Sequence, residues 1–426
     1  MQIQIKNIWK IENAIVNLDW LSVIAWNNDT WKTTVSKIVF SVIKAFQRYK
    51  NDFNISKEEI LEEKIWDLYR VLRYFIRNIE RSENKLNNLN DLLKKDFYPP
   101  IFLNELSIFW NEDIFEMKKN KILELWFKKW EKERILKELD NIKVEFLKEE
   151  KREDLIKKAL KNILKSEFEN QFNNNLWKRW IIELKEWKIL LFKIILENNN
   201  ILEVKINDDV LKIKDTTFID SPIHLNLFNY LNIRTNIPWR RNRELPFHIS
   251  DLFTKIRDSR FDEEKKNIFV KIIKEIVWWT FKVIRENFQD KLIFEKEWEK
   301  INPLNTATWI KSFWLLDLLD KSNNLESENL LILDEPEVHL HPEWQVKYAR
   351  LIIDLIEERK LSVLITSHSP YMIEALSKFS KEKDINASFY LAEENGKWKC
   401  VIEDKTEKKY EIFEKLSKPF RNLMLK

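Results

Sequence analysis

The feature that most restricts how this chain can fold is its near-total lack of glycine. Among 426 residues there is one glycine, Gly396, beside 19 tryptophans. A chain of this length would ordinarily carry roughly 30 glycines. Tight turns need positive φ values, which glycine alone adopts without steric cost. A soluble fold of this size cannot make all its turns without glycine, so the written composition itself needs an explanation.

The excess of tryptophan offers that explanation. The chain is rich in Lys, Asn and Ile, which is typical of AT-rich coding DNA, and in such DNA the Trp codon UGG should be scarce. We hypothesise that most of the tryptophans are UGA codons that the source organism translates as glycine, as some bacterial lineages do. The coding DNA tests this, because UGA supports glycine and UGG supports Trp.

Charge, cysteine content and hydropathy exclude several classes of protein. Lys and Arg total 74 against 70 for Asp and Glu, so no global basic field points to nucleic acid. The single cysteine, Cys400, rules out a disulfide framework and a CxxC zinc hook, and suits a reducing cytoplasm. The start MQIQIKNI is not a signal peptide, and no apolar run approaches about 18 residues. We therefore expect a cytoplasmic protein without a membrane span.

Hydrophobic periodicity predicts an α/β fold with insertions. We expect strands at 2–8 and 21–25 and a helix from about 32 to 49. Charged amphipathic helices should follow over 55–170, either as a protruding arm or packed on the core. Alternation over 180–214 predicts antiparallel strands, and 223–290 reads as mainly helical.

Near-continuous apolar strands alternate with helices in the last third of the chain, which predicts a parallel sheet covered on both faces. The expected strands are 330–333, 362–366 and 388–392, and the expected helices are about 343–359, from 370, and 409–424. The domain boundaries that we predict are 1–50, 51–179, 180–222, 223–300 and 301–426.

The stretch VIAWNNDTWKTTVSK, residues 23–37, has the spacing of a phosphate-binding loop between a strand and a helix. Lys32 stands where such a loop places the lysine that reaches the β- and γ-phosphates, and Thr33 where it places a magnesium-binding hydroxyl. The two glycine positions are occupied by Trp26 and Trp31. With glycine there, the loop would read GNNDTGKT. The expected nucleotide-binding residues of this loop are Trp26, Asn27, Asn28, Asp29, Thr30, Trp31, Lys32, Thr33 and Thr34.

Two further motifs follow apolar strands. In LLILDEPEVHLHPEWQ, Asp334 is expected to hold Mg²⁺ and Glu335 to orient and deprotonate the attacking water. In SVLITSHSP, His368 at the strand end is expected to sense the γ-phosphate. Each motif alone could be an ordinary polar strand end, but their combination with Lys32 and Thr33 favours ATP hydrolysis.

These motifs resemble the ABC-type ATPase heads of the RecF/SMC/OLD-like group, including bacterial AAA-domain ATP-binding proteins. The likeness covers residues 1–50 and about 215–426, and it implies a P-loop NTPase fold with a mainly parallel sheet, an antiparallel β subdomain and a helical insertion. It also implies a signature segment, LNTATWIKSFWLL, that caps ATP on the opposite subunit. The matching residues are Thr308, Trp309, Lys311 and Ser312.

The resemblance also bears on the tryptophans. Heads of this group carry glycine at the positions of Trp9, Trp20, Trp26, Trp31, Trp278, Trp279, Trp309 and Trp314. We therefore expect Trp26, Trp31 and Trp309 to fit their surroundings poorly, and Trp344 to pack well.

His339 and His341 form an HxH pair that could bind zinc with Glu337. The resemblance instead places them in a loop that contacts the partner subunit.

The resemblance implies an ATP- and Mg²⁺-dependent ATPase that forms a homodimer around ATP. DNA or a separate effector protein could be a further partner, with DNA repair or anti-phage defence as the setting by analogy of fold. If Trp26 and Trp31 are genuine, the chain is instead an inactive scaffold. A third reading is the ATPase partner of a separate nuclease, since about 50 residues after His368 are too few for a nuclease domain.

Overall fold

The computed structural model describes residues 1–26, 32–79, 93–109, 113–124, 127–169, 179–186, 189–197, 200–207, 211–231, 245–259, 280–286, 289–296, 299–396 and 399–424. These residues form two compact units. The head unit comprises Met1–Gln47 and Ile156–Lys426, and the helical unit comprises Arg48–Leu155.

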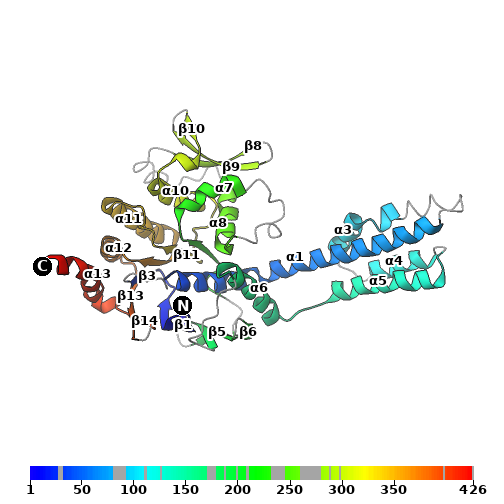
Figure 1. Cartoon of the computed structure of the whole chain (residues 1–426), viewed down its shortest axis with the longest axis horizontal. Helices are drawn as coiled ribbons and strands as arrows, with labels where there is room; N and C mark the ends of the chain where they lie inside the picture. Colours follow the sequence, from blue (N-terminus) through cyan, green and yellow to red (C-terminus); the bar gives the residue numbers. More distant parts are fainter. Residues whose placement is uncertain are drawn as a thin grey trace. The chain divides into compact units, whose positions relative to one another are not determined.

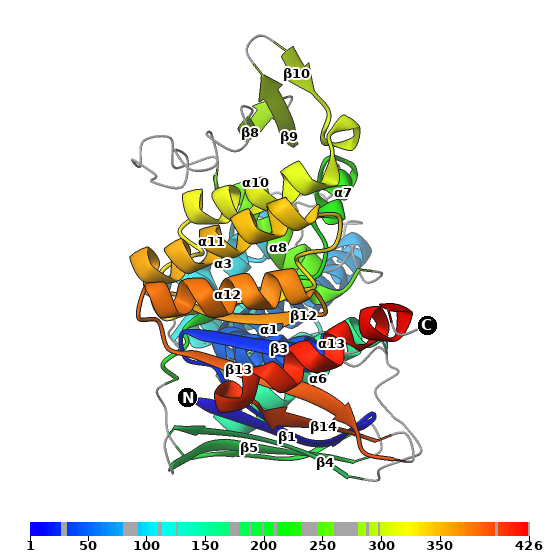
Figure 2. The same ribbon diagram turned by 90° about the vertical axis from the view of Figure 1, so that its left-hand side faces the viewer.

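A large mixed sheet forms the centre of the head unit (Figures 1 and 2). Among the described residues it has 11 strands in the order β6-β5-β4-β1-β2-β14-β13-β3-β12-β11-β7. The strands are β1 (Gln2–Ile8), β2 (Ile11–Asn17), β3 (Leu21–Trp26), β4 (Arg179–Glu186), β5 (Ile189–Glu197), β6 (Asn200–Ile206), β7 (Asp215–Ile219), β11 (Asn329–Asp334), β12 (Ser362–Ser367), β13 (Ala387–Glu394) and β14 (Cys400–Asp404).

The two halves of this sheet differ in strand direction. From β13 through β3, β12 and β11 to β7, every pairing is parallel, whereas β6, β5, β4, β1 and β2 pair antiparallel. Every residue of β3 is buried, and β11 and β12 are buried after their first residue, which explains their near-continuous apolar sequences. The predicted α/β class is confirmed. The antiparallel strands extend the same sheet, because β4 pairs with β1.

Helices cover the parallel half of the sheet. Figure 2 shows α11 and α12 side by side next to β12 and β3. Side chains of α8, α10, α11 and α12 share one core with these strands. The described helices that lie in the head unit are η1 (Pro222–His224), α7 (Leu225–Leu231), α8 (Phe247–Asp258), η4 (Pro303–Asn305), α10 (Thr308–Lys321), α11 (Pro342–Arg359), α12 (Pro370–Glu382), η5 (Thr406–Lys408) and α13 (Lys409–Met424). α6 (Arg152–Glu167) belongs to it from Ile156 onward.

A small antiparallel sheet corrects one prediction. Residues 280–290 were expected to be helical, but they belong to the hairpin of β8 (Thr280–Glu286) and β9 (Gln289–Lys296), which β10 (Glu299–Ile301) extends. Phe281 and Val283 flank exposed Lys282, and their buried side chains join the core that contains α10. Both ribbon views show this sheet beyond α10, away from the large sheet (Figures 1 and 2).

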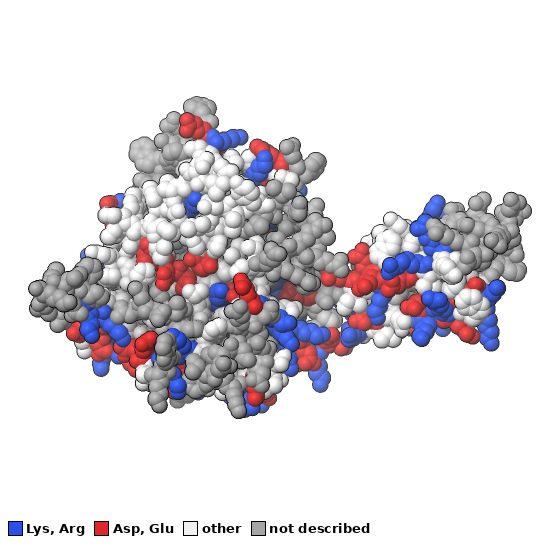
Figure 3. Space-filling model, viewed as in Figure 1, with Lys and Arg blue, Asp and Glu red and all other residues white. Residues whose placement is uncertain are grey.

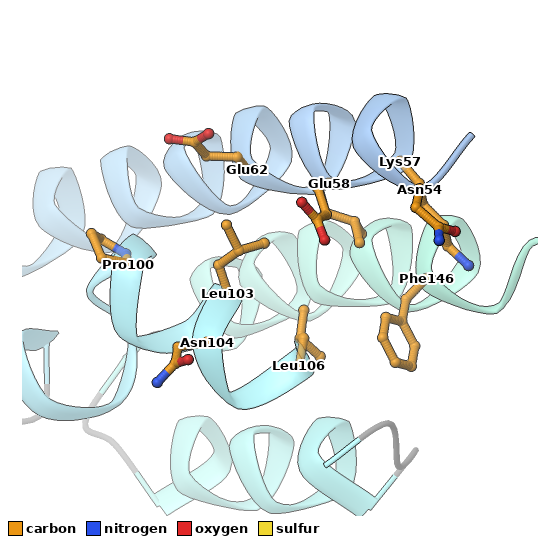
Figure 4. A pocket seen from close by; sticks show the side chains of 10 residues that line it. Asn54, Lys57, Glu58, Glu62, Pro100, Leu103, Asn104, Leu106 and Phe146 are labelled. Atoms are coloured by element: carbon orange, nitrogen blue, oxygen red, sulfur yellow. The ribbon is translucent and has the colours of Figure 1, made fainter. Parts of the chain in front are cut away.

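The helical unit has its own apolar core, formed by residues of α1 (Lys32–Ile79), α3 (Pro99–Phe109), α4 (Asp113–Glu124) and α5 (Lys129–Leu147). The first turns of α1 belong to the head unit and the rest to the helical unit. A cavity of about 430 Å³ lies between α1, α3 and α5, where Leu103, Leu106 and Phe146 meet Glu58 and Glu62 (Figure 4). None of the helices in the described part of the chain combines the length and apolar character needed to cross a bilayer.

Candidate nucleotide site

Three parallel strands deliver the candidate site to one edge of the sheet. β12 pairs with β3 on one side and β11 on the other, with Asp334 opposite Thr366 and Thr366 opposite Ile24. The carboxyl ends of β3, β11 and β12 therefore meet, as ligand sites of such sheets require. The loop after β3, residues 27–31, lies outside the described residues, as does the side chain of Lys32. α1 begins at Lys32, which is where a helix is expected to follow the predicted loop.

Asp334 and Thr33 meet at this edge although 301 positions separate them in the chain. The Thr33 Oγ1 hydroxyl donates to Asp334 Oδ2 over 2.5 Å. The hydroxyl of Thr366 donates to the other carboxylate oxygen, and Asp334 is 7% exposed. Carboxylate and hydroxyl oxygens are ligands that Mg²⁺ accepts, so Thr33 and Asp334 fit the ion that their sequence motifs predict. Thr34, at the next position of α1, is itself buried.

Glu335 and His368 lie beside this pair. Glu335 has a positive φ of 47°, and its backbone N–H donates to Thr366 O over 3.0 Å. His368 Nδ1 is 3.6 Å from Glu335 Oε1, and both side chains are partly open to solvent. A carboxylate and an imidazole that are accessible and adjacent can contact a water molecule and a phosphate.

Glu337 fixes the turn that carries His368, a role that sequence reasoning missed. Its buried Oε1 accepts hydrogen bonds from Ser367 Oγ at 2.7 Å, from the His368 N–H at 2.8 Å and from the Ser369 N–H at 3.2 Å. Ser369 then caps α12 by accepting from the Met372 N–H. The second glutamate of DEPE could have signalled this role.

The proposed signature residues divide into two groups. Thr308 and Trp309 are half-buried in the first turn of α10. Lys311 and Ser312 are buried, and Lys311 Nζ donates to Asn226 Oδ1 over 2.7 Å. Burial lowers the pKa of Lys311. In this arrangement the start of α10 is partly open to solvent, whereas Lys311 is not.

A buried charge network lies behind the site. Lys44 of α1 contacts Asp215 at 2.6 Å and Asp251 at 2.9 Å, and Lys255 contacts Asp215 at 2.8 Å. Burial alone would lower the pKa of Lys44, but the two carboxylates raise it above its ordinary value. Burial would raise the pKa of Asp215, but Lys44 and Lys255 hold it below normal. The network ties α1, β7 and α8 together.

His339 and His341 are exposed in and after a turn, not in a strand. Within the described ranges they form no group of three side chains that could hold a metal.

Comparison with known proteins supports an ATPase head. Residues 310–374, which contain Asp334, Glu335 and His368, match a protein family described as "AAA domain, putative AbiEii toxin, Type IV TA system". The resemblance to an AAA-type ATPase head is thereby confirmed.

Among curated proteins with similar sequences, Septu protein PtuA of Bacillus thuringiensis is 42% identical over 48 residues, 11% of this chain. Protein ea59 of Escherichia phage lambda is 28% identical over 88 residues, 21% of this chain. The matches span 12% and 16% of the lengths of these relatives.

Among solved structures, the SmcHead bound to the C-winged helix domain of ScpA is 9% identical with a TM-score of 0.40, covering 96% of this chain and 98% of that one. The SMC head domain from Thermotoga maritima is 8% identical with a TM-score of 0.38, covering 95% and 97%.

Proposed function

We propose that this chain binds ATP with Mg²⁺ and hydrolyses it, and that two copies dimerise around the nucleotide. The observation that carries the proposal is the contact of Thr33 with Asp334, with Glu335 and His368 beside it. The loop 26–34 would hold the phosphates, and Thr33 and Asp334 the ion. Mg²⁺, when bound, would neutralise charge on the phosphates.

Each side chain has a distinct task in this proposal. Glu335 orients a water molecule on the γ-phosphate and accepts its proton as the oxygen attacks phosphorus and the bond to the β-phosphate oxygen breaks. His368 hydrogen-bonds the γ-phosphate, and Glu337 holds its backbone in place. Lys32 contributes positive charge to the β- and γ-phosphates.

The surface around α7 and α10 suits a second copy of the chain. Exposed apolar side chains gather on η1, α7 and η4, and Figure 3 shows a face with few charged side chains over this part of the head unit. These residues are Ile223, Leu227, Tyr230 and Leu304. Dimerisation would bring the start of α10, with Thr308 and Trp309, to the phosphates bound by the other subunit.

One observation favours the alternative of an inactive scaffold. Trp26 is 4% exposed at the end of β3, where the predicted phosphate-binding loop begins. A genuine indole would therefore be buried at the first position of that loop. Comparing ATP binding by the written chain and by a chain with glycine at 26, 31 and 309 separates the two functions. Binding by the glycine form alone supports an ATPase with misread codons, and binding by neither form leaves the scaffold.

The hydrolytic role is tested on the glycine form with Glu335→Gln. An amide cannot accept the proton, so we expect turnover to fall about 10²- to 10⁴-fold while ATP binding persists. Exposed Glu343→Gln serves as the control, with parental turnover expected. Hydrolysis by Glu335→Gln at the parental rate would show that Glu335 is not the base.

A further inference from the structure

A second cluster of ligand-type side chains lies at the end of β7, beside the nucleotide site but separate from it. Asp220 directly follows β7, whose last residue pairs with Leu333 of β11. His224 comes from η1 and His248 from α8. One carboxylate oxygen and one nitrogen of each imidazole all lie within 4.8 Å of one another.

The ligand-type atoms of this cluster lie close together but do not form well-aligned hydrogen bonds with one another. His224 Nε2 is 2.8 Å from Asp220 Oδ1, and His248 Nε2 is 3.2 Å from Asp220 Oδ2. Even so, Asp220 Oδ1, His224 Nε2 and His248 Nε2 are buried and make no hydrogen bond of normal geometry. Buried polar atoms without partners are rare in native proteins, and an ion that binds all of them is one explanation.

A buried carboxylate orients His248 toward the cluster. Glu167 at the end of α6 lies 2.8 Å from His248 Nδ1 through Oε2, and its Oε1 accepts from the His248 backbone N–H at 2.7 Å. A proton on Nδ1 that is shared with Glu167 leaves the lone pair of Nε2 directed at Asp220. Metal-binding histidines commonly have this carboxylate partner, which fixes their tautomer and ring orientation.

Charge and surroundings also suit a cation. Two carboxylates, Asp220 and Glu167, face His248, whose exposed side-chain fraction is 1%. His248 packs on Phe218 with ring centroids 4.7 Å apart, so an apolar ring lies against the imidazole. Two negative charges at the edge of an apolar environment attract a divalent cation.

We propose that Asp220, His224 and His248 bind one divalent transition-metal ion of the zinc type. Two imidazole nitrogens and a carboxylate oxygen form a common zinc donor set, with ligand–ligand separations of about 3.3 Å around a tetrahedral ion. The three atoms already lie within 4.8 Å of one another, and metal binding would draw them to that spacing. Mg²⁺ prefers oxygen ligands, so this site is chemically distinct from the Thr33–Asp334 site.

The ion would link elements that approach from different parts of the chain. Asp220 directly follows β7, and His224 is the last residue of η1, just before α7. His248 lies on α8, and its partner Glu167 is the last residue of α6. A bound metal ion would hold η1 and α8 against the carboxyl end of β7. The inference does not depend on ATP hydrolysis.

The test measures metal content and stability rather than activity. Full-length protein with a tag that lacks histidine is stripped with chelator, incubated with Zn²⁺, desalted and analysed by elemental mass spectrometry. Co²⁺ in place of Zn²⁺ reports coordination by its visible absorption. The variants are His224→Ala and Asp220→Asn, and the control is His341→Ala, which removes an exposed histidine outside the cluster.

We expect about one Zn²⁺ per chain in the parent and in His341→Ala, and at least a tenfold loss of affinity in His224→Ala and Asp220→Asn. Zn²⁺ should raise the melting temperature of the parent and leave that of folded His224→Ala unchanged.

No zinc in the parent, or parental binding in both cluster variants, would overturn the proposal. The cluster would then be an ion pair of protonated His248 with Asp220 and Glu167. Circular dichroism verifies folding, and the parent's cobalt spectrum tests the ligand set even if a variant fails to fold.

Discussion

Two tryptophans adopt backbone conformations that suit glycine. Trp9, in the turn between β1 and β2, has φ 53°, and Trp20, just before β3, has φ 54°. Bulky side chains are disfavoured in this left-handed region. Both positions are among those at which resembling proteins carry glycine, and this agreement supports the codon hypothesis.

Other tryptophans do not behave as the hypothesis led us to expect. Trp26 is buried, and Trp309 stacks on Trp344 with ring centroids 4.5 Å apart. Trp344 packs as expected, but Trp309 is not out of place beside it. Trp31 lies outside the described residues. Backbone conformation therefore agrees with the hypothesis at Trp9 and Trp20, whereas side-chain packing does not support it at Trp26 and Trp309.

Trp20 permits a matched test in the written chain. The residue is 37% exposed, so removing its indole loses little burial. Trp20→Gly and Trp20→Ala both delete the indole, but glycine alone relieves the positive φ. We expect the glycine variant to be more stable than the alanine variant by about 1 kcal/mol in denaturant unfolding. Equal stability, or a more stable alanine variant, would contradict the assignment of glycine to this position.

Glu337 should matter for the turn that carries His368. Glu337→Ala leaves three donors without their acceptor, so we expect the free energy of unfolding to fall by about 1–3 kcal/mol. Glu337→Gln should recover part of this loss, because the amide oxygen can still accept. Chemical denaturation measures the series, with exposed Glu343→Ala as control. A cost for Glu337→Ala no larger than that of the control would show that these hydrogen bonds contribute little.

Side chains of the candidate site were predictable where they belong to a local motif. Thr33, Asp334 with Glu335, and His368 each belong to a motif next to an apolar strand, with recognisable spacing; the side chain of Lys32, from the same motif as Thr33, lies outside the described residues. The partner of Asp334 on β12, Thr366, and the cluster of Asp220, His224 and His248 carried no such signal. Their contacts arise from strand register and from elements that are distant in sequence, which one sequence does not reveal.

At the scale of elements, strongly periodic segments were predicted well and interrupted ones were not. The strands and helices that were predicted after residue 329 lie within a few residues of their expected bounds, but strand β14 was not predicted. α1 was expected to stop near residue 49, and the residues that follow include Asn51, Asp52 and Asn54, which are typical of turns. The helix continues to Ile79. An ion pair between Arg48 and Asp52, one helical turn apart, stabilises it through this polar stretch.

The charge network that joins α1, β7 and α8 should stabilise the head unit strongly. Lys44→Met removes the cation between Asp215 and Asp251 and leaves buried carboxylates with less compensation. We expect a loss of about 3–5 kcal/mol in denaturant unfolding, as for other broken buried ion pairs. Lys50→Met, on the exposed surface of the same helix, should have little effect. A small cost for Lys44→Met would mean that Lys255 alone neutralises both carboxylates.

At the scale of the whole molecule, the proposed dimer has a consequence that a monomeric ATPase lacks. In a two-fold symmetric dimer, each site would combine the phosphate loop of one copy with the start of α10 from the other. Lys32→Ala removes the lysine of the phosphate loop, and Thr308→Glu places a negative charge at the start of α10. In the glycine form of the chain, each variant alone should therefore lose ATPase activity.

A mixture of these two inactive variants should regain activity. Only the mixed dimer contains one intact site, built from the phosphate loop of the Thr308→Glu copy and the α10 start of the Lys32→Ala copy. Random pairing at equal concentrations predicts about a quarter of parental turnover, because half of the dimers are mixed and each has one working site. Phosphate release measured across mixing ratios should peak near equal amounts.

As a control, mixing Lys32→Ala with Glu335→Gln should restore nothing, since both substitutions lie on the same side of the site and every pairing leaves each site defective. Activity that stays at background in the Lys32→Ala and Thr308→Glu mixture, with both variants folded, would exclude a shared site and leave each head to act alone.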